Sequence, residues 1–327
     1  MKKLNVIGID IGGTKCAIVS GSIAGDGRVN IVGKSVFPTE TDKGFDHTLQ
    51  NIYHYIDVEL GKTGLVPAQL AAIGISCGGP LDSEKGLIMS PPNLPGWDNI
   101  PLVELIENRY HVKTGVQNDA NACTLAEWKY GAGQGYKNVI FLTFGTGMGA
   151  GLVLDGRLYA GTNDMAGEVG HIRLENTGPV GYGKAGSFEG FCSGGGIAQL
   201  ARTLALEKLQ MGASVSFCAS LADLETINAK TVAEAALKGD STAIEIYRQC
   251  GHYLGKALSL LIDILNPEVI VLGSIYGRSQ ELIEPAMRSV IECETLSHSR
   301  RVCRIVSAGL GESIGDYAAL SVAAYLL

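Results

Sequence analysis

The chain has 327 residues, of which 46% are hydrophobic, and this length exceeds the usual limit for one hydrophobic core. We therefore expect two globular domains. The formal net charge of −7 and the pI near 5.4 argue against a broad basic surface for nucleic acid or an anionic membrane.

The first half of the chain predicts three strands, a helix and a fourth strand, followed by two further helices. The predicted strands are residues 4–11, 15–20, 29–36 and 70–76, and another extended stretch ends at Val116. The predicted helices are residues 45–60, 102–110 and 120–130, with a Pro-rich loop over 91–101 before the second of them.

The second half begins with strands from Val139 and continues into a Gly-rich insertion over 161–196. Helices are predicted near 196–210, 231–237, 241–265 and 279–292, and strands over 269–272 and 302–306. A last helix, rich in Ala and Leu, runs from Ile314 to the end. It is apolar enough to pack back on the first domain, which would then be discontinuous in sequence.

Two stretches, 5–14 and 138–147, repeat one pattern. Each is an apolar strand that ends in a polar residue, Asp10 or Thr143, and a Gly/Thr loop. An apolar run and an Asp-Gly-Arg turn follow, over 26–28 and 155–157. The repeat predicts a duplication, so that both halves approximate βββαβαβα. Main-chain N–H groups of such glycine loops can surround phosphate oxygens, although Gly-rich hairpins have the same pattern.

Neither the start of the chain nor its cysteines suggest export. Asp10 and the glycines after it interrupt the apolar segment that a signal peptide needs, and no stretch approaches the roughly 18 apolar residues of a membrane helix. The eight cysteines have no C-x-x-C spacing and stand mostly in apolar contexts, which predicts reduced, buried thiols. We therefore expect a cytoplasmic protein.

Polar residues at three places are candidates for a site. Asn118-Asp119-Ala120-Asn121 follows an extended stretch, where it can start a helix or supply an Asp that accepts a hydroxyl proton. Glu168-Val-Gly-His171 and, after it, Glu189 can bind a polyhydroxylated ligand or be ordinary surface charges and caps. Asn93 can join them from its Pro-rich loop or simply form a turn.

Two other motifs fail in their context. Gly145-Thr-Gly-Met-Gly-Ala150 matches a dinucleotide fingerprint, but a strand and a turn follow it where the fingerprint requires a helix. Residues 178–185 nearly match a phosphate-binding P-loop, but Ala185 has no hydroxyl and no strand leads into the segment.

In their order along the chain, these motifs resemble the ROK family of sugar kinases, part of the actin-like ATPase superfamily, and the resemblance runs nearly end to end. It implies an α/β, ribonuclease H-like fold of two duplicated βββαβαβα lobes with an interlobe cleft. We predict a small lobe over 1–117 plus 311–327 and a large lobe over 118–310.

The resemblance also implies ATP-dependent phosphorylation of a hexose, and we expect glucose to react at its 6-hydroxyl, with Asp119 as the general base and Asp10 orienting Mg²⁺ through water. The implied sugar ligands are Gly79, Pro80, Asn93, Asn118, Glu168, His171 and Glu189. The implied nucleotide ligands are Asp10, Gly12, Gly13, Thr14, Lys15, Gly145, Thr146, Gly147 and Gly273. A homodimer is implied as well.

The sequence departs from the family pattern at the family's zinc site. Val180, Tyr182 and Ser187 occupy the three cysteine positions, which leaves only His171 of the usual ligands. Valine cannot bind zinc, so we expect no zinc site. The segment after Leu272 also lacks the usual Gly triplet, which leaves the adenosine contacts undefined.

Alternatives remain at this stage. The sugar can instead be N-acetylmannosamine, allose, fructose or a β-glucoside, since the same side chains suit all of them. A sugar-sensing ROK regulator without catalysis is the rival class. Such regulators carry an N-terminal helix-turn-helix, and the first predicted strand here begins at residue 4.

Overall fold

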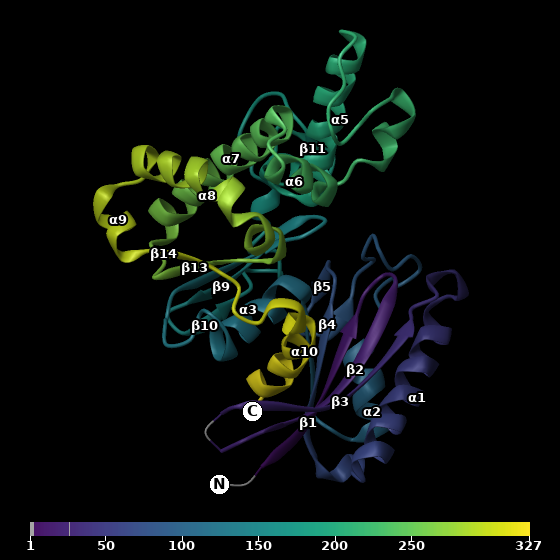
Figure 1. The fold of residues 1–327 in the computed structure, drawn as a ribbon. Helices are drawn as coiled ribbons and strands as arrows, with labels where there is room; N and C mark the ends of the chain where they lie inside the picture. The colour runs from purple at the N-terminus through teal and green to yellow at the C-terminus, as the bar shows by residue number, and fades with distance from the viewer. Residues whose placement is uncertain (1–2, 26) are drawn as a thin grey trace. The chain divides into compact units, whose positions relative to one another are not determined.

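The computed structural model describes residues 3–25 and 27–327 (Figure 1). Asp26, in the first predicted Asp-Gly-Arg turn, lies outside the described residues. The chain forms two compact units. The first comprises Met1–Lys137, Gly151–Ala166 and Gly309–Leu327, and the second comprises Asn138–Ala150 and Gly167–Ala308.

The first unit is built on a five-stranded mixed sheet of order β3-β2-β1-β4-β7. Its strands are β1 (Leu4–Ile11), β2 (Lys15–Ile23), β3 (Val29–Pro38), β4 (Leu70–Cys77) and β7 (Thr114–Asn118), with a small hairpin of β5 (Leu81–Asp82) and β6 (Leu87–Ile88). Its helices are α1 (Phe45–Thr63), α2 (Leu102–Tyr110), α3 (Asp119–Tyr130) and α10 (Ile314–Tyr325), with short 3-10 turns at Thr41–Lys43, Pro67–Gln69 and Gly311–Ser313.

A second five-stranded sheet has the order β10-β9-β8-β13-β14. Its strands are β8 (Val139–Phe144), β9 (Met148–Leu154), β10 (Arg157–Tyr159), β13 (Val269–Leu272) and β14 (Arg304–Ser307), and β11 (Val180–Gly181) pairs with β12 (Lys184–Ala185) apart from it. The helices of the second unit are α4 (Phe188–Cys192), α5 (Gly194–Gln210), α6 (Ala229–Leu237), α7 (Ser241–Leu265), α8 (Ser274–Glu294) and α9 (Ser297–Val302), with 3-10 turns at Val169–His171 and Leu221–Thr226.

The two sheets have the same strand order. If the strands of each sheet are numbered 1 to 5 along the chain, both sheets have the spatial order 3-2-1-4-5. In both, strands 4 and 5 run parallel to strand 1. The duplication predicted from the two Gly/Thr loops is therefore confirmed. How the two units are placed relative to each other, and with it the predicted interlobe cleft, stays a prediction.

Helix α10 lies on the first sheet because three glycines leave room for it (Figure 1). Gly8, Gly74 and Gly115 are in register on β1, β4 and β7. A Cβ on Gly74 would lie 2.2 Å from the backbone nitrogen of Ala323, and one on Gly8 would lie 2.8 Å from the Cβ of Ala319. Only hydrogen fits at these positions, so the backbone of the helix packs directly on the sheet. The predicted return of the last helix to the first unit is confirmed.

Helix α3 also packs with α10, through Ala122, Leu125, Ala318 and Val322. The buried Glu127 carboxylate then accepts N–H groups from Ala132, Gly309 and Leu310 at 2.7, 3.0 and 2.9 Å. These contacts place α3 in the first compact unit, whereas the predicted lobes divide before residue 118. The lobe boundaries themselves stay a prediction.

Most helices and strands lie where the sequence predicts them, and the exceptions are short. Residues 297–302 form α9, so Val302 ends a helix where we expected a strand to begin. The insertion over 161–196 contains a hairpin, the helix α4 and the start of α5, because Gly turns and Ser caps order it without periodic apolar residues.

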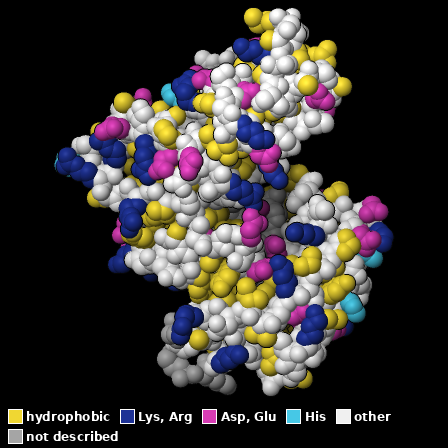
Figure 2. All heavy atoms as spheres, in the orientation of Figure 1, with side chains coloured by type: hydrophobic (Ala, Val, Ile, Leu, Met, Phe, Trp, Pro, Cys, Tyr) yellow, Lys and Arg dark blue, Asp and Glu magenta, His cyan; other side chains and the backbone are white. Residues whose placement is uncertain are grey.

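The structure also bears on the cysteines, on membrane-spanning helices and on the surface charge. All eight cysteines are free, and five of them are buried. Among residues 3–25 and 27–327, no helix combines the length and the hydropathy needed to cross a bilayer. Lys and Arg side chains are interspersed with Asp and Glu over the face in Figure 2, where no broad basic patch is visible.

Replacing Gly74 by Ala tests the close approach of α10. The added methyl group overlaps the helix backbone, so we expect the free energy of unfolding to fall by about 1–3 kcal/mol in urea titrations. Gly61→Ala is the matched control, since Gly61 lies in α1 with nothing near its Cβ position. That variant should gain about 0.5–1 kcal/mol. Equal stability of Gly74→Ala and wild type would contradict the packing described here.

Candidate active site

The carboxyl ends of three parallel strands in the first unit carry most of its candidate residues. Asp10 near the end of β1 is in register with Ser76 of β4, and Cys77 at the end of β4 is in register with Asn118 of β7. Carboxyl ends of parallel strands meet at one edge of a sheet, which is where open α/β folds bind ligands. The structure thus brings Asp10, the Gly78–Pro80 turn and the start of α3 to one edge.

Asn118 and Asp119 differ in what they do at the start of α3. Asn118 is the N-cap of α3, and its side chain accepts the N–H of Asn121 at 2.7 Å. Asp119 is the first residue of the helix and is exposed, with Oδ1 2.8 Å from the backbone nitrogen of Ala120. The helix start therefore needs only Asn118 as its cap. Desolvation by the surrounding protein raises the pKa of Asp119 even though its side chain reaches solvent.

Asp10 lies among like charges. Burial, and then the charges of Asp119 and Asp316, raise its pKa to about 6, while a hydrogen bond with Ser76 acts in the opposite direction. Asp316, in the first turn of α10, pairs with Lys34 of β3 at 2.5 Å. A Cβ on Gly315 would lie 3.3 Å from Oδ2 of Asp10, so the start of α10 is against this carboxylate. Concentrated negative charge of this kind suits a cation.

The first glycine loop, residues 12–15, connects β1 to β2. The N–H of Gly12 donates to the carbonyl of Lys15 at 3.0 Å, and Thr14 and Lys15 are exposed. Gly13 packs against the neighbouring loop, because a Cβ there would lie 2.6 Å from the carbonyl oxygen of Asn93. A Cβ on Gly78 would lie 3.3 Å from the Asn93 amide. Asn93 is therefore in contact with two other candidate segments.

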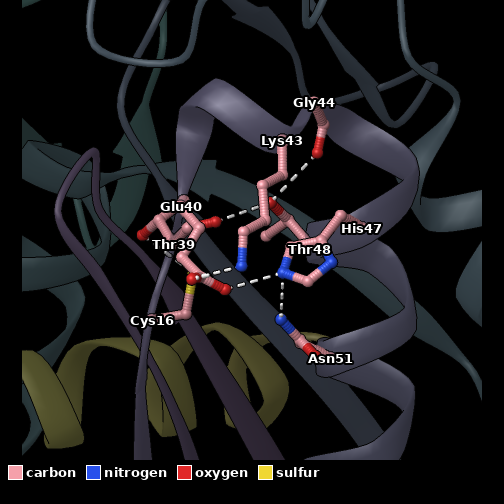
Figure 3. A network of polar contacts seen from close by, with 8 residues as sticks. All are labelled: Cys16, Thr39, Glu40, Lys43, Gly44, His47, Thr48 and Asn51. Atoms are coloured by element: carbon pink, nitrogen blue, oxygen red, sulfur yellow. Dashed lines mark hydrogen bonds and ion pairs between the residues drawn. The ribbon is translucent and has the colours of Figure 1, made fainter.

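Thr39 is hydrogen-bonded to this loop, and Figure 3 shows its contacts with Cys16 and Thr48. Its hydroxyl donates to the carbonyl of Gly12 at 2.6 Å, and its N–H donates to the carbonyl of Thr14 at 3.0 Å. The Thr48 hydroxyl at the start of α1 donates in turn to the carbonyl of Thr39 at 2.9 Å. Cys16 lies 3.5 Å from the Thr39 hydroxyl, and burial raises the pKa of its thiol to about 11. The sequence analysis missed Thr39, since a Thr at the end of a strand has no distinctive pattern.

Figure 3 also draws the surface beyond Thr39. Glu40 has left-handed backbone angles and pairs with Lys43 at 2.6 Å and with His47 at 2.7 Å, and Asn51 lies 3.1 Å from the same ring nitrogen of His47. These contacts fix the turn between β3 and α1. Each pair is exposed enough to add little stability on its own.

The second glycine loop belongs to the second unit. Its carbonyl groups at Gly145 and Thr146 accept the N–H groups of Gly194 and Gly195 at the start of α5, at 2.8 and 3.2 Å. Glu189 is next to this loop, and its Oε2 accepts the N–H of Met148 at 2.9 Å. At least one oxygen of Glu189 thus holds the loop in place.

Glu168 precedes the 3-10 turn over 169–171 and His171 ends it, and both are exposed. The turn is fixed from both sides, because a Cβ on Gly170 would lie 2.1 Å from the carbonyl oxygen of Met148 and 3.3 Å from the Cβ of Glu189. The rings of His171 and Tyr182 meet edge to face at 6.4 Å. Glu168, His171, Glu189 and the second glycine loop therefore lie together in the second unit.

Gly273 is buried at the end of β13, and its N–H donates to the carbonyl of Leu142. Ser274, which begins α8, donates its hydroxyl to the carbonyl of Phe144 at 2.9 Å. Gly273 is thus hydrogen-bonded to β8, the strand that leads into the second glycine loop. The sequence analysis did not single out Ser274, which follows the end of β13, or the Gly194–Gly196 run, which begins α5.

Hydrogen bonds hold the segment where the family pattern would place zinc. Ser187 caps α4 by accepting the N–H of Gly190 at 3.1 Å, and Lys184 donates to the carbonyl of His171 at 2.8 Å. Arg173 donates to the carbonyl of Ala185 at 2.7 Å. In the described part of the chain, no group of three or more His, Cys, Asp or Glu residues is arranged to hold a metal ion.

The fold and these residues define an α/β protein of the actin-like ATPase type, with a glycine loop after the first strand of each sheet. The chain belongs to the ROK family, whose family model matches residues 6–325. The family assignment made from the motifs is confirmed.

Three relatives illustrate the range of the family. The chain is 30% identical to a glucokinase of Thermotoga maritima over 324 residues, 98% of each chain. It is 30% identical over 285 residues to the DNA-binding transcriptional dual regulator NagC of Escherichia coli, covering 86% of this chain and 67% of that one. It superposes with a TM-score of 0.73 on a ROK family glucokinase from Streptomyces griseus, in complex with glucose and AMPPNP, at 27% identity over 98% of this chain and 99% of that one.

Thr39→Val tests the support of the first glycine loop. The change keeps the shape of the side chain but leaves the carbonyl of Gly12 without its donor, so we expect a loss of about 1–2 kcal/mol in the free energy of unfolding. Thr39→Ser keeps the hydroxyl, so its free energy of unfolding should fall by less. Urea titrations of both variants measure these free energies. A free energy of unfolding for Thr39→Val equal to that of wild type would refute the contact.

Metal removal tests the segment over 180–187. Its hydrogen bonds require no ion, so treatment with a zinc chelator should leave the Tm unchanged. Elemental analysis provides the independent check. One zinc per chain, or a fall in Tm after chelation, would show that the sequence departure was misinterpreted.

Proposed function

We propose that this protein is an ATP-dependent hexose kinase in which Asp119 is the general base, and that glucose is phosphorylated at its 6-hydroxyl. The observation that carries the proposal is the position of Asp119. Its side chain is exposed at the carboxyl edge of the first sheet, and its charge helps to raise the pKa of Asp10. The glucokinase relatives support the same reaction class.

The raised pKa of Asp119 suits a general base. A carboxylate that is more basic than an ordinary aspartate accepts the hydroxyl proton more readily as the oxygen attacks phosphorus. Asn118 uses its Oδ1 as the helix cap, so its amide nitrogen would donate to the sugar. Gly79, Pro80 and Asn93 would complete the sugar contacts of the first unit, and Glu168, His171 and Glu189 those of the second.

The glycine loops would bind the nucleotide. Residues Gly12–Lys15 and Gly145–Gly147 would surround the phosphates with N–H groups, and Lys15 would add a positive charge. Thr39 and the start of α5 would keep the two loops in shape. Gly273 and Ser274 would lie near the adenosine.

The residues around Asp10 fit Mg²⁺. The donor atoms are carboxylate oxygens, which Mg²⁺ prefers, and the mutual repulsion of Asp10, Asp119 and Asp316 is the kind that a divalent cation relieves. Bound there through water, Mg²⁺ would neutralise charge on the transferred phosphoryl group. Asp10 would hold its position through the hydrogen bond with Ser76.

The sugar itself needs a direct assay. N-acetylmannosamine, allose, fructose and a β-glucoside present hydroxyl groups that the same side chains suit. A coupled assay of ADP release across this panel and glucose, with Mg²⁺, ranks them by kcat/KM. Glucose should rank first.

A sugar-responsive regulator is the second candidate, because NagC shares the same 30% identity with this chain, over 285 residues. The net charge of −7 disfavours binding to DNA by this part of the chain. An electrophoretic shift assay with genomic fragments, with and without sugar, separates the two functions. Kinase turnover without any shift supports the enzyme.

We also infer a cytoplasmic homodimer. Apolar side chains of α7 support an interface, since Leu260 and Ile264 are 44% and 73% exposed beside a pocket of about 300 Å³. Light scattering after size-exclusion chromatography gives the molar mass, and a monomer at micromolar concentration would contradict the dimer.

Asp119→Asn tests the general base. The amide cannot accept the proton, so kcat should fall by about a hundredfold or more, whereas the affinity for the sugar, measured by calorimetry, should stay the same. Asp57→Asn is the matched control, because Asp57 is a half-exposed carboxylate paired with Arg109 on the surface. Undiminished turnover in Asp119→Asn would exclude this assignment.

A further inference from the structure

Asp164 has an unusual backbone and unusual partners for a loop residue. It follows β10 in the first unit, with φ of 59°, in the left-handed region that side chains other than Gly, Asn and Asp seldom adopt. Asp tolerates these angles, and unlike Gly it also brings a carboxylate to this position.

Both oxygens of Asp164 accept hydrogen bonds from one residue, Ser83. The N–H of Ser83 donates to Oδ2 and its hydroxyl donates to Oδ1, each at 2.7 Å. Bonds to an ionised carboxylate are among the stronger hydrogen bonds of proteins. They connect segments 81 residues apart, the β5–β6 hairpin and the loop after β10. We call this pair of bonds the Ser83–Asp164 clasp.

The loop that carries Asp164 is closed at its base. The N–H of Ala166 donates to the carbonyl of Ala160 at 3.0 Å, and a Cβ on Gly161 would lie 3.0 Å from that of Ala166. Residues 160–166 thus form a compact loop that is fixed at its ends by its own backbone and near its tip by the clasp.

The Ser83 side of the clasp continues within a few residues into a proposed sugar ligand. Pro80 precedes Ser83 by three residues, and the carbonyl of Pro80 accepts the N–H of Met89 at 2.9 Å, which closes the β5–β6 hairpin. The hairpin that carries Ser83 is therefore closed next to Pro80.

We propose that Asp164 is a positioning residue for hexose binding, whose clasp on Ser83 holds the hairpin that follows Pro80. The inference rests on the proposed sugar-kinase function, because Pro80 is one of its expected ligands. The clasp does not touch the nucleotide loops. It therefore acts on the sugar and not on ATP.

Four variants of the full chain separate the side chain from the backbone. Asp164→Gly removes the clasp and relieves the left-handed backbone, Ser83→Ala removes the hydroxyl bond only, and the double variant combines them. Asp164→Asn tolerates the same backbone and keeps an acceptor oxygen. His111→Gly is the matched control, since His111 has φ of 56° at the end of α2.

Hydrogen exchange tests the clasp without any assay of function. In Asp164→Gly, peptides covering 81–86 and 160–168 should exchange faster than in wild type, and in His111→Gly they should not. Unchanged exchange in Asp164→Gly would overturn the proposal, because the clasp would then constrain neither segment.

Steady-state kinetics tests the positioning role. In Asp164→Gly the KM for the hexose should rise about tenfold, the loss of roughly one such hydrogen bond in binding free energy, while the KM for ATP stays within about twofold. Asp164→Asn should recover part of the loss, and the double variant should be no worse than Asp164→Gly. An unchanged hexose KM, or equal rises for hexose and ATP, would overturn the proposal.

Failure of the proposed function has a different signature. If wild type phosphorylates no hexose, the kinase assignment fails whatever the exchange results are. Calorimetric affinity for the hexoses then replaces KM, with the same tenfold expectation for Asp164→Gly. Affinity equal to that of wild type would overturn the positioning role there too.

Discussion

The first unit depends on the close packing of α10 against the glycines of the first sheet. Gly8, Gly74 and Gly115 present bare backbone on three adjacent parallel strands. Residues of α10 fill the space over Gly8 and Gly74, and the side chain of Leu326 fills the space over Gly115. The contact ties the last residues of the chain to the first strand and brings the first turn of α10 against Asp10. The position of Asp316 next to the proposed catalytic edge follows from packing and not from proximity in sequence.

Buried or crowded carboxylates of the first unit have opposite roles. Glu127 accepts three backbone N–H groups and stabilises the turn after α3 and the start of the 309–327 segment. The pKa of Asp10 is raised by burial and by the charges of Asp119 and Asp316, and the pKa of Asp119 is raised by desolvation. Their charge costs stability at neutral pH, which is typical of groups kept for binding or catalysis.

Sequence reasoning found what is local or repeated. The spacing of apolar residues predicted the bounds of most strands and helices to within a few residues. The two Gly/Thr loops predicted the duplication. Sequence reasoning also singled out Asp119, since a polar cluster between an extended stretch and a helix has a recognisable pattern. The Asn118 cap could be expected from composition, but only the hydrogen bond to Asn121 shows which residue of the pair caps the helix.

What sequence reasoning missed depends on contacts between distant segments. Thr39, Asp164 and Asp316 are ordinary residues in their local context, and each acquires a role only through a partner brought near by the fold: Gly12, Ser83 and Lys34. The alignment of Gly8, Gly74 and Gly115 across three strands was also not predicted, because the sequence of one strand does not determine its register with the next. Short elements such as α9 lack enough residues for a periodic pattern to appear.

The central claim is that Asp119 faces the hydroxyl group that receives the phosphoryl group. A crystal structure with glucose and a nonhydrolysable ATP analogue tests it most directly. We predict the Asp119 carboxylate within hydrogen-bonding distance of the sugar 6-hydroxyl, and both glycine loops in contact with phosphate oxygens. Glucose bound away from Asp119, or an analogue whose phosphates touch neither loop, would contradict the account.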